Sequence, residues 1–124
     1  MIVRRLDEAL SVDWGNGVSR RLLLESDGMG FTVADTIVNA GTSSRLQYLD
    51  HLEAVYCISG TGEITEQSGV VHPIGPGTMY ALNEHDAHSI TAHAEQDLHL
   101  VSVFFPALRG PERHDVRSGA YSSY

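Results

Sequence analysis

A carboxylate, a phenol and an imidazole lie along residues 51–88 at spacings that could gather them around one metal ion. Glu53 belongs to the alternating segment HLEAVYCI, whereas Tyr80 and His88 belong to TMYALNEHDAH, which follows a Gly-Pro-Gly turn. These three donor types together suit a hard or borderline divalent cation such as Fe(II). Three protein ligands would leave coordination positions open, as catalytic metal sites do. The competing interpretation is that Tyr80 packs in the core with its hydroxyl hydrogen-bonded.

Further polar residues could move protons or hold a substrate near these groups. His51 precedes Glu53 by two residues and therefore shares its strand face. Glu112 and His114 follow the strand that Pro106 ends, and they could form an acid–base pair at the mouth of a barrel. Arg21 could bind a carboxylate through two parallel hydrogen bonds. From the residues alone, each of these side chains could equally face solvent.

Short alternating segments separated by glycine-rich and proline-rich turns would have to position these groups. The pattern predicts strands over residues 20–24, 29–38, 45–48, 51–58, 78–82, 89–93 and 98–105. Strands that recur every 8–12 residues or so, with turns between them, are typical of an antiparallel sandwich or small barrel. Helix is expected in short turns at most, near residues 6–10. The predicted fold is therefore an all-β, single-domain antiparallel barrel.

Length and composition limit the functional classes. A chain of 124 residues is expected to form one domain over 1–124, with a loose tail over 116–124. A formal net charge of −8 argues against nucleic acids and anionic membranes as partners. We expect no secretory peptide and no membrane span, because no apolar run is long enough. The single cysteine, Cys57, suits a reducing cytoplasm.

Two motifs resemble those of the cupin superfamily. The first contains Glu53 and Gly60, and the second contains Gly77 with His88 eleven residues later. Ordinary cupins place two metal-binding histidines just before the glutamate. Here Gln47 and Leu49 stand at those positions, and neither can bind a metal. The resemblance therefore implies the fold but excludes the usual cupin metal site.

The strings DGMGF, HLEAVYCISGTGEI, PGTMYALNEHDAH and GPERHD together resemble the ectoine synthase family. This resemblance implies a jelly-roll-like barrel, a cytoplasmic homodimer and an iron site, with another divalent metal as the alternative. The implied reaction is that of a hydro-lyase, which closes N-γ-acetyl-L-2,4-diaminobutyrate to ectoine with loss of water.

The resemblance also implies roles for individual residues. The implied metal ligands are Glu53, Tyr80 and His88. The implied catalytic residues are Tyr48, His51, Glu112 and His114. The implied substrate-binding residues are Arg21, Thr36, Tyr48, His51, Leu82, Asp86, Phe104, Pro106, Gly110, Glu112 and His114.

Some positions depart from the family pattern. Gly17 stands where the family has a substrate-lining tryptophan, Ala34 replaces an asparagine, and Ser43-Ser44-Arg45 replaces an acidic residue, threonine and histidine. These departures motivate a second hypothesis, a cupin enzyme acting on a related amino-acid derivative. A third hypothesis is a non-enzymatic cupin that binds a small ligand, although the presence of all three implied metal ligands argues against it.

Overall fold

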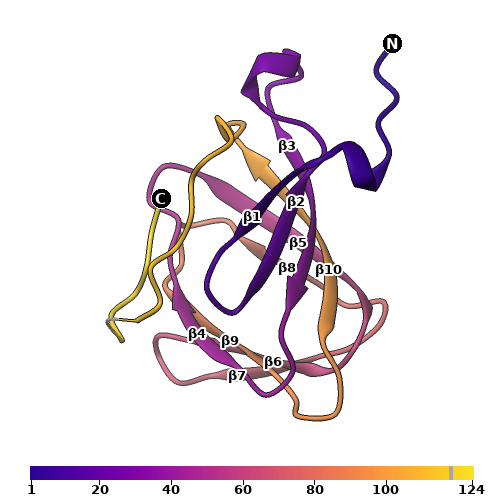
Figure 1. The fold of residues 1–124 in the computed structure, drawn as a ribbon. Helices are drawn as coiled ribbons and strands as arrows, with labels where there is room; N and C mark the ends of the chain where they lie inside the picture. The colour runs from indigo at the N-terminus through magenta and orange to yellow at the C-terminus, as the bar shows by residue number, and fades with distance from the viewer. Residues whose placement is uncertain (118) are drawn as a thin grey trace.

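Two antiparallel sheets face each other in the computed structural model, which describes residues 1–124 except residue 118 (Figure 1). The larger sheet has the order β1 (Leu10–Asp13), β2 (Gly17–Arg21), β3 (Thr32–Val38), β10 (Leu98–Phe105), β5 (Leu52–Ser59) and β8 (Met79–Leu82). The smaller sheet has the order β4 (Ser43–Leu46), β9 (His88–Ala92), β6 (Gly62–Glu66) and β7 (Val71–Ile74). The described helical structure consists of two 3₁₀ turns, η1 (Leu6–Glu8) and η2 (Glu25–Asp27). The predicted all-β antiparallel fold is confirmed.

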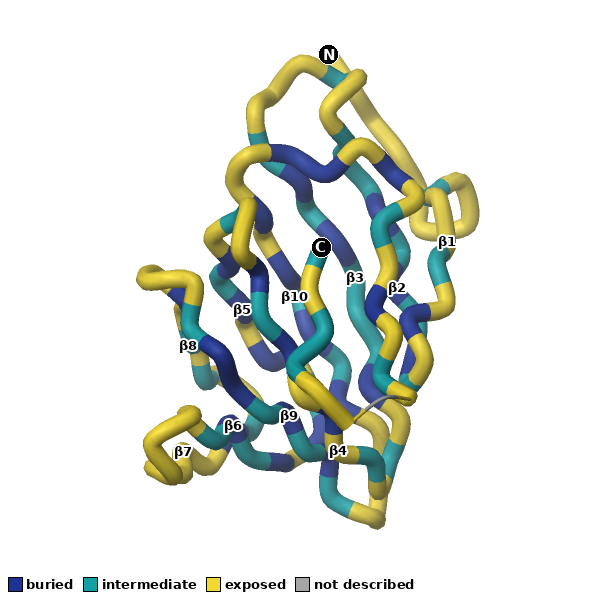
Figure 2. The backbone as a smooth tube through the Cα atoms, turned by 90° about the vertical axis from the view of Figure 1, so that its left-hand side faces the viewer, coloured by how far each residue is buried: buried dark blue, intermediate teal, exposed yellow. Residues whose placement is uncertain are grey.

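Strict alternation along the strands decides which side chains enter the space between the sheets. In β5, Glu53, Val55 and Cys57 are buried, whereas the intervening Tyr56 and Ile58 are exposed. The same alternation runs along β10 and β3, which Figure 2 shows as buried and less buried residues in turn. Because successive side chains of a strand point to opposite faces, one strand supplies both core and site residues to the interior.

The interior holds two apolar clusters. The larger fills the space between the sheets and consists of Trp14, Val38, Leu46, Val55, Cys57, Ile64, Ile74, Ile90, Ala92, Leu98 and Leu100. The smaller consists of Tyr48, Leu82, Phe104 and Leu108. Leu98 and Leu108 are completely buried, and each such side chain contributes about 1.5–3 kcal/mol relative to an exposed one. The polar site described below lies where the two clusters meet.

The C-terminal segment is not the loose tail that the sequence predicts over 116–124, of which residue 118 lies outside the described residues. The Gln47 amide donates to the Ser122 carbonyl at 2.8 Å, and the Ser122 amide donates to the Arg45 carbonyl at 3.0 Å. Tyr124 packs edge-on against Tyr48, with ring centroids 5.1 Å apart. Backbone pairing and aromatic packing hold residues 121–124 beside the opening of the barrel (Figures 1 and 2).

Three short strands were not predicted, β1, β6 and β7. The strands β1 and β7 lie at sheet edges and are largely exposed, so the apolar alternation that marks a half-buried strand is missing. Internal strand β6, with the sequence GEITE, carries one apolar side chain, Ile64, which is too few to alternate. No described helix is long and apolar enough to cross a bilayer.

Trp14 occupies interior space that the glycine at position 17 leaves empty. Its indole is 4% exposed and donates to the Ile37 carbonyl at 3.2 Å. A Cβ atom on Gly17 would lie 1.8 Å from that carbonyl oxygen and 3.0 Å from the Trp14 indole nitrogen. The glycine is therefore required for the close approach of β2 to β3 beside the indole.

We expect Gly17→Ala to lower the free energy of unfolding by about 1–3 kcal/mol, because the added methyl group overpacks this contact. Urea unfolding followed by the fluorescence of Trp14, the single tryptophan, measures the loss. Gly75→Ala is the matched control, because the nearest atom to its added Cβ would lie 3.8 Å away. Equal stability of the two variants would contradict the steric explanation.

Candidate functional site

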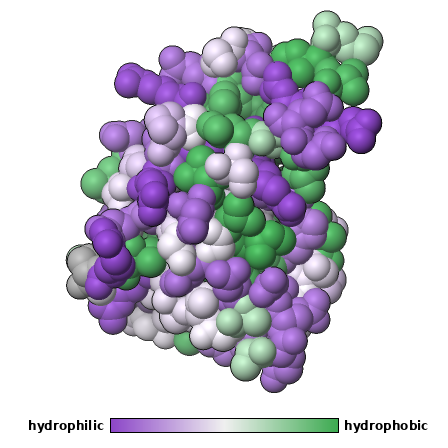
Figure 3. Space-filling model, viewed as in Figure 1, coloured by the Kyte–Doolittle hydropathy of each residue, from purple (hydrophilic) through white to green (hydrophobic). Residues whose placement is uncertain are grey.

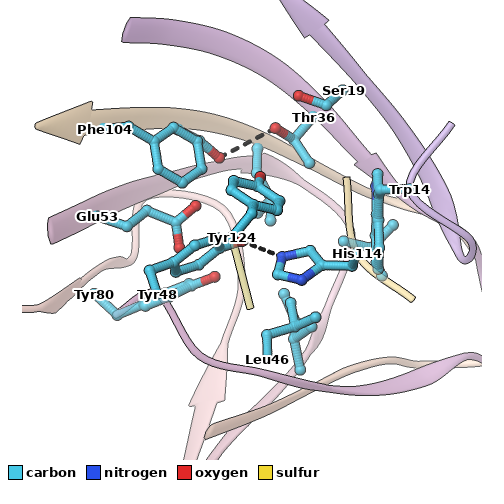
Figure 4. A pocket seen from close by; sticks show the side chains of 14 residues that line it. Trp14, Ser19, Thr36, Leu46, Tyr48, Glu53, Tyr80, Phe104, His114 and Tyr124 are labelled. Atoms are coloured by element: carbon cyan, nitrogen blue, oxygen red, sulfur yellow. Dashed lines mark hydrogen bonds between the residues drawn. The ribbon is translucent and has the colours of Figure 1, made fainter. Parts of the chain in front are cut away.

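A small cavity of about 30 Å³ lies between the two apolar clusters. Its apolar walls include Trp14, Leu46 and Phe104. Its polar side chains come from strands of the larger sheet, from Tyr48 just after β4 and from the C-terminal segment (Figure 4). The lining residues are Trp14, Ser19, Thr36, Val38, Leu46, Tyr48, Glu53, Tyr80, Ile90, Leu100, Ser102, Phe104, His114 and Tyr124. A cavity of this volume admits water but no amino-acid derivative. A substrate would have to displace one of the walls.

Glu53 brings a carboxyl group into this cavity from the start of β5, one residue after the strand begins. Its side chain is 7% exposed, and burial raises its pKa to about 8, although a hydrogen bond with Ser102 opposes the rise. Burial without a cation penalises the charged form. The carboxyl group is therefore poised to ionise fully when a cation binds beside it.

Tyr80, on β8, lines the cavity with Glu53, and His88, on β9, lies beside Tyr80. Burial raises the pKa of the Tyr80 phenol, and its hydroxyl has no hydrogen-bond partner among the described residues. His88 is 2% exposed and donates from Nδ1 to the Asp86 carbonyl at 2.9 Å, which leaves Nε2 as the free lone pair. Burial also lowers the pKa of His88 and so favours the neutral imidazole. The two rings lie 6.5 Å apart, centroid to centroid.

These three groups fit a divalent cation. Within the described part of the chain, no three His, Cys, Asp or Glu side chains gather at one point, so a metal site here needs the phenol as a ligand. A nearby cation lowers the pKa of a phenol enough for it to bind as phenolate. An Nδ1–H bond to a carbonyl is the usual way in which a metal-binding histidine is oriented. Glu53, Tyr80 and His88 would hold the cation.

Arg21 supplies a positive charge beside the cavity. Its side chain has no exposed surface, and its guanidinium donates to the Gly110 carbonyl and, at 3.3 Å, to the Ser19 hydroxyl. Nη2 faces the Tyr124 hydroxyl at 3.5 Å. Because Tyr124 lines the cavity, a ligand that displaced its ring would meet this face of the guanidinium.

Glu112 forms an ion pair with Arg21, with 3.8 Å between Oε1 and Nη1. Both carboxylate oxygens accept backbone hydrogen bonds at 2.8 Å, from the amides of Arg109 and Gly110. Burial alone would raise the pKa of Glu112, but these donors and Arg21 outweigh burial and lower it. Glu112 is therefore an anion that fixes the turn after Pro106.

His51 lies at the rim of the site. Its Nδ1 donates to the Pro106 carbonyl at 2.8 Å, which leaves Nε2 as an acceptor. Its ring lies 6.3 Å from Phe104 and 6.4 Å from Tyr124, centroid to centroid. This arrangement presents a basic nitrogen next to the cavity.

His114 connects the cavity to the C-terminal segment. Its Nε2 lies 2.9 Å from the Tyr48 hydroxyl, its Nδ1 lies 3.0 Å from the Ser122 hydroxyl, and its ring stacks on Tyr124 at 4.4 Å. Burial, followed by the neighbouring His88 and Arg21, lowers the pKa of His114 to about 3. A neutral imidazole donates at one nitrogen and accepts at the other, so His114 can link the two hydroxyl groups.

Most of the residues that the sequence implicates lie around this cavity. Thr36, Tyr48, Glu53, Tyr80, Phe104 and His114 line it. Arg21, His51 and His88 contact its walls, Pro106 bonds to His51, and Gly110 and Glu112 contact Arg21. Two do not line it: Leu82 belongs to the smaller apolar cluster and Asp86 to a surface turn, and both border a separate outer groove.

Sequence reasoning missed eight lining residues, of which four are aliphatic and four carry polar atoms, and the four polar ones are considered in turn. Ser19 and Ser102 share strand parity with Arg21 and Phe104, so alternation could have identified them. Nothing local to Trp14 or Tyr124 indicates that they enter the cavity, because each arrives from a segment outside the central strands.

The sequence of this chain is similar to those of known ectoine synthases. The family model described as ectoine synthase matches residues 1–124. The L-ectoine synthase of Desulfatibacillum aliphaticivorans is 52% identical over 128 residues, covering 98% of this chain and 96% of that protein. The L-ectoine synthase of Halalkalibacterium halodurans is 50% identical over 107 residues, covering 86% of this chain and 81% of that protein.

Solved structures agree. The crystal structure of ectoine synthase from P. lautus is similar with a TM-score of 0.83 and 46% identity, covering 89% of this chain and 81% of that one. The polyketide cyclase RemF from Streptomyces resistomycificus has a TM-score of 0.72 at 15% identity and so shares the fold alone. These matches show that the chain belongs to the ectoine synthase family.

Proposed function

We propose that this protein is a metal-dependent hydro-lyase that closes N-γ-acetyl-L-2,4-diaminobutyrate to ectoine. The observation that carries the proposal is that Glu53 and Tyr80 line a cavity that Arg21 flanks, with the His88 ring 6.5 Å from the Tyr80 ring. The substrate has a carboxylate, an amine and an acetamide. The site offers Arg21 for the carboxylate, His51 for the amine, and the cation-binding residues Glu53, Tyr80 and His88 for the acetamide.

Substrate binding begins at Arg21. The carboxylate replaces the Tyr124 hydroxyl at Nη2, since this is the face of the guanidinium that looks toward the cavity. Glu112 and the Gly110 carbonyl keep the other face of the guanidinium in place. Displacement of the Tyr124 ring also enlarges the cavity enough to admit the folded substrate. Ring closure is unimolecular, so holding the two ends together lowers its barrier.

Two protons must move from the amine nitrogen to the acetamide oxygen, which then leaves as water and gives the cyclic amidine as its cation. His51 Nε2, at the rim of the cavity, accepts each proton from the nitrogen, the first before the amine attacks the acetamide carbon. The Tyr48 hydroxyl, held by His114, donates each proton to the departing oxygen, and solvent returns the protons from His51 to Tyr48. The metal, when bound, supplies Lewis acidity that polarises the acetamide.

We further propose Fe(II) as the native metal and the cytoplasm as the compartment. A carboxylate, phenolate and imidazole set suits Fe(II), and other divalent metals of similar hardness are the alternatives. Cys57, the single cysteine, is buried and unpaired, which fits a reducing compartment.

We expect Glu53→Ala, Tyr80→Ala and His88→Ala each to lose bound metal and to lose formation of ectoine from N-γ-acetyl-L-2,4-diaminobutyrate, while the circular dichroism of the β fold is kept. Elemental analysis and product chromatography are the measurements. His99→Ala, on the outward face of β10, is the matched control, because this histidine bonds to Asp35 away from the cavity. Full iron occupancy in Tyr80→Ala would refute the three-ligand site.

We expect His51→Ala to keep its metal but to lose about 10²–10⁴-fold in kcat, the usual contribution of a positioned base. Glu112→Ala should also keep its metal and lose turnover, because Arg21 and the turn after Pro106 lose their anchor. Steady-state kinetics separate the effects. A change in KM alone in His51→Ala would mean that His51 only binds substrate.

We also propose a homodimer, supported by an apolar area on the outward face of the larger sheet. Cross-strand neighbours Tyr56 and Met79 are 51% and 60% exposed, and Leu52 lies opposite Phe105, which is 61% exposed. Further apolar side chains gather at the N-terminal end and down the side that carries β1 (Figure 3). Exposed apolar areas of this kind mark protein–protein interfaces.

We expect light scattering at micromolar concentration to give twice the 13.5 kDa of one chain, and Tyr56→Arg to shift the mass toward one chain. Thr65→Arg, on β6 of the other sheet, should stay dimeric. A wild-type mass near 13.5 kDa would refute the dimer.

A further inference from the structure

A second, much larger depression borders the same three-ligand site from outside. This groove has a volume of about 780 Å³ and runs between β8 and the strands β6, β7 and β9. Tyr80 lines both the groove and the cavity, whereas His88 lines the groove only. Two of the three proposed metal ligands can therefore be approached from a side that the substrate cavity does not use.

The groove and the cavity differ in charge. The groove is lined by the carboxylates of Glu66, Glu84 and Asp86 and by two imidazoles besides His88, and neither lysine nor arginine lines it. The cavity, in contrast, lies beside the buried guanidinium of Arg21. A groove of one sign with low-dielectric walls raises the local concentration of ions of the opposite sign. This groove attracts cations and repels the carboxylate of an amino-acid derivative.

A polar pair stands at the solvent side of the groove. Glu66 and His72 are about half exposed, with side-chain exposures of 51% and 55%, and their Oε2 and Nε2 atoms lie 2.6 Å apart. Glu66 is the register partner of His88 on the adjacent strand β9. On the inward face of the smaller sheet, the exposed pair Glu66 and His72 therefore lies at one end of the groove, and the proposed ligand His88, which is 2% exposed, lies at the other.

At the inner end of the groove, His88 presents a ring nitrogen that makes no hydrogen bond within the part of the chain that the structure describes. The ring is almost completely buried, its Nδ1 bonds to the Asp86 carbonyl, and its Nε2 has no hydrogen-bond partner among the described residues. Tyr80 beside it likewise has a hydroxyl without one. Neither atom has a competing partner in the described chain, and both belong to donor types that bind divalent metals, so a cation arriving along the groove could bind to both.

We propose that the groove is the entry and exit route of the divalent cation, with Glu66 and His72 as its first protein contacts. The cation reaches Tyr80 and His88 from this side, and the substrate enters through the cavity on the other side. Metal exchange therefore does not require Tyr124 to move. This inference rests on the proposed metal site and adds its route of loading.

The test measures the rate of metal uptake rather than activity. Metal-free protein is prepared with a chelator and mixed with Co(II) in a stopped-flow instrument, and the visible absorption of bound Co(II) is followed. We expect Glu66→Gln and His72→Gln to slow uptake roughly threefold to tenfold and to weaken its dependence on salt, because less cation is concentrated at the mouth. Final occupancy should equal that of the wild type, since neither residue is a ligand.

The chain offers a matched control on the same strand. Glu63 lies on the opposite face of β6, 3.9 Å from His93, and neither residue lines the groove. Glu63→Gln removes the same charge and should load like the wild type. Loading of Glu66→Gln and His72→Gln at the rate of Glu63→Gln would overturn the route but leave the metal site standing. Lower final occupancy with unchanged rate would overturn it too, and a wild type that takes up no Co(II) would refute the metal site itself.

Discussion

The guanidinium of Arg21, which has no exposed surface, is the point on which the mouth of the barrel depends. Burying a charge in this way is tolerable only when its donors are satisfied and an opposite charge lies near. Those requirements are met by the Gly110 carbonyl, the Ser19 hydroxyl and the Glu112 carboxylate. One strand near the start of the chain is thereby joined to the segment after Pro106. That segment then carries His114 and leads on to Tyr124, so the wall of the cavity follows from the burial of a single side chain.

The position of the site between two apolar clusters explains how it can hold polar groups at all. Leucine, valine and isoleucine side chains below it provide the stability, and the cavity above them excludes bulk water. In such surroundings a charged form loses its hydration, which is why burial raises the pKa of Glu53 and lowers those of His88 and His114. Because bulk water is excluded, the carboxyl, phenol and imidazole groups would interact strongly with a bound cation.

The alternating residues of β5 and β10 were sufficient to predict strands with Glu53 facing inward and His99 facing outward, because a period of two is a local property. Edge strands escaped prediction because they bury too little to alternate. The C-terminal residues were assigned to a loose tail since small and polar residues carry no local signal. Tyr124 reaches the cavity only because the backbone of Ser122 pairs with β4, a contact between segments more than seventy residues apart. Such contacts are set by tertiary structure, which no local pattern records.

The packing of Trp14 against the bare backbone of Gly17 has a consequence for how sequences of this kind can diverge. An indole from position 14 and any side chain at position 17 compete for one space, because a Cβ at 17 would collide with the Ile37 carbonyl beside the indole. A lineage that moved the aromatic wall between these positions would pass through a chain that carries both groups or neither. A chain that carries both groups is overpacked, and a chain that carries neither lacks an aromatic wall for the cavity. The two positions therefore constrain each other, and the fitness of a substitution at either one depends on which substitution came first.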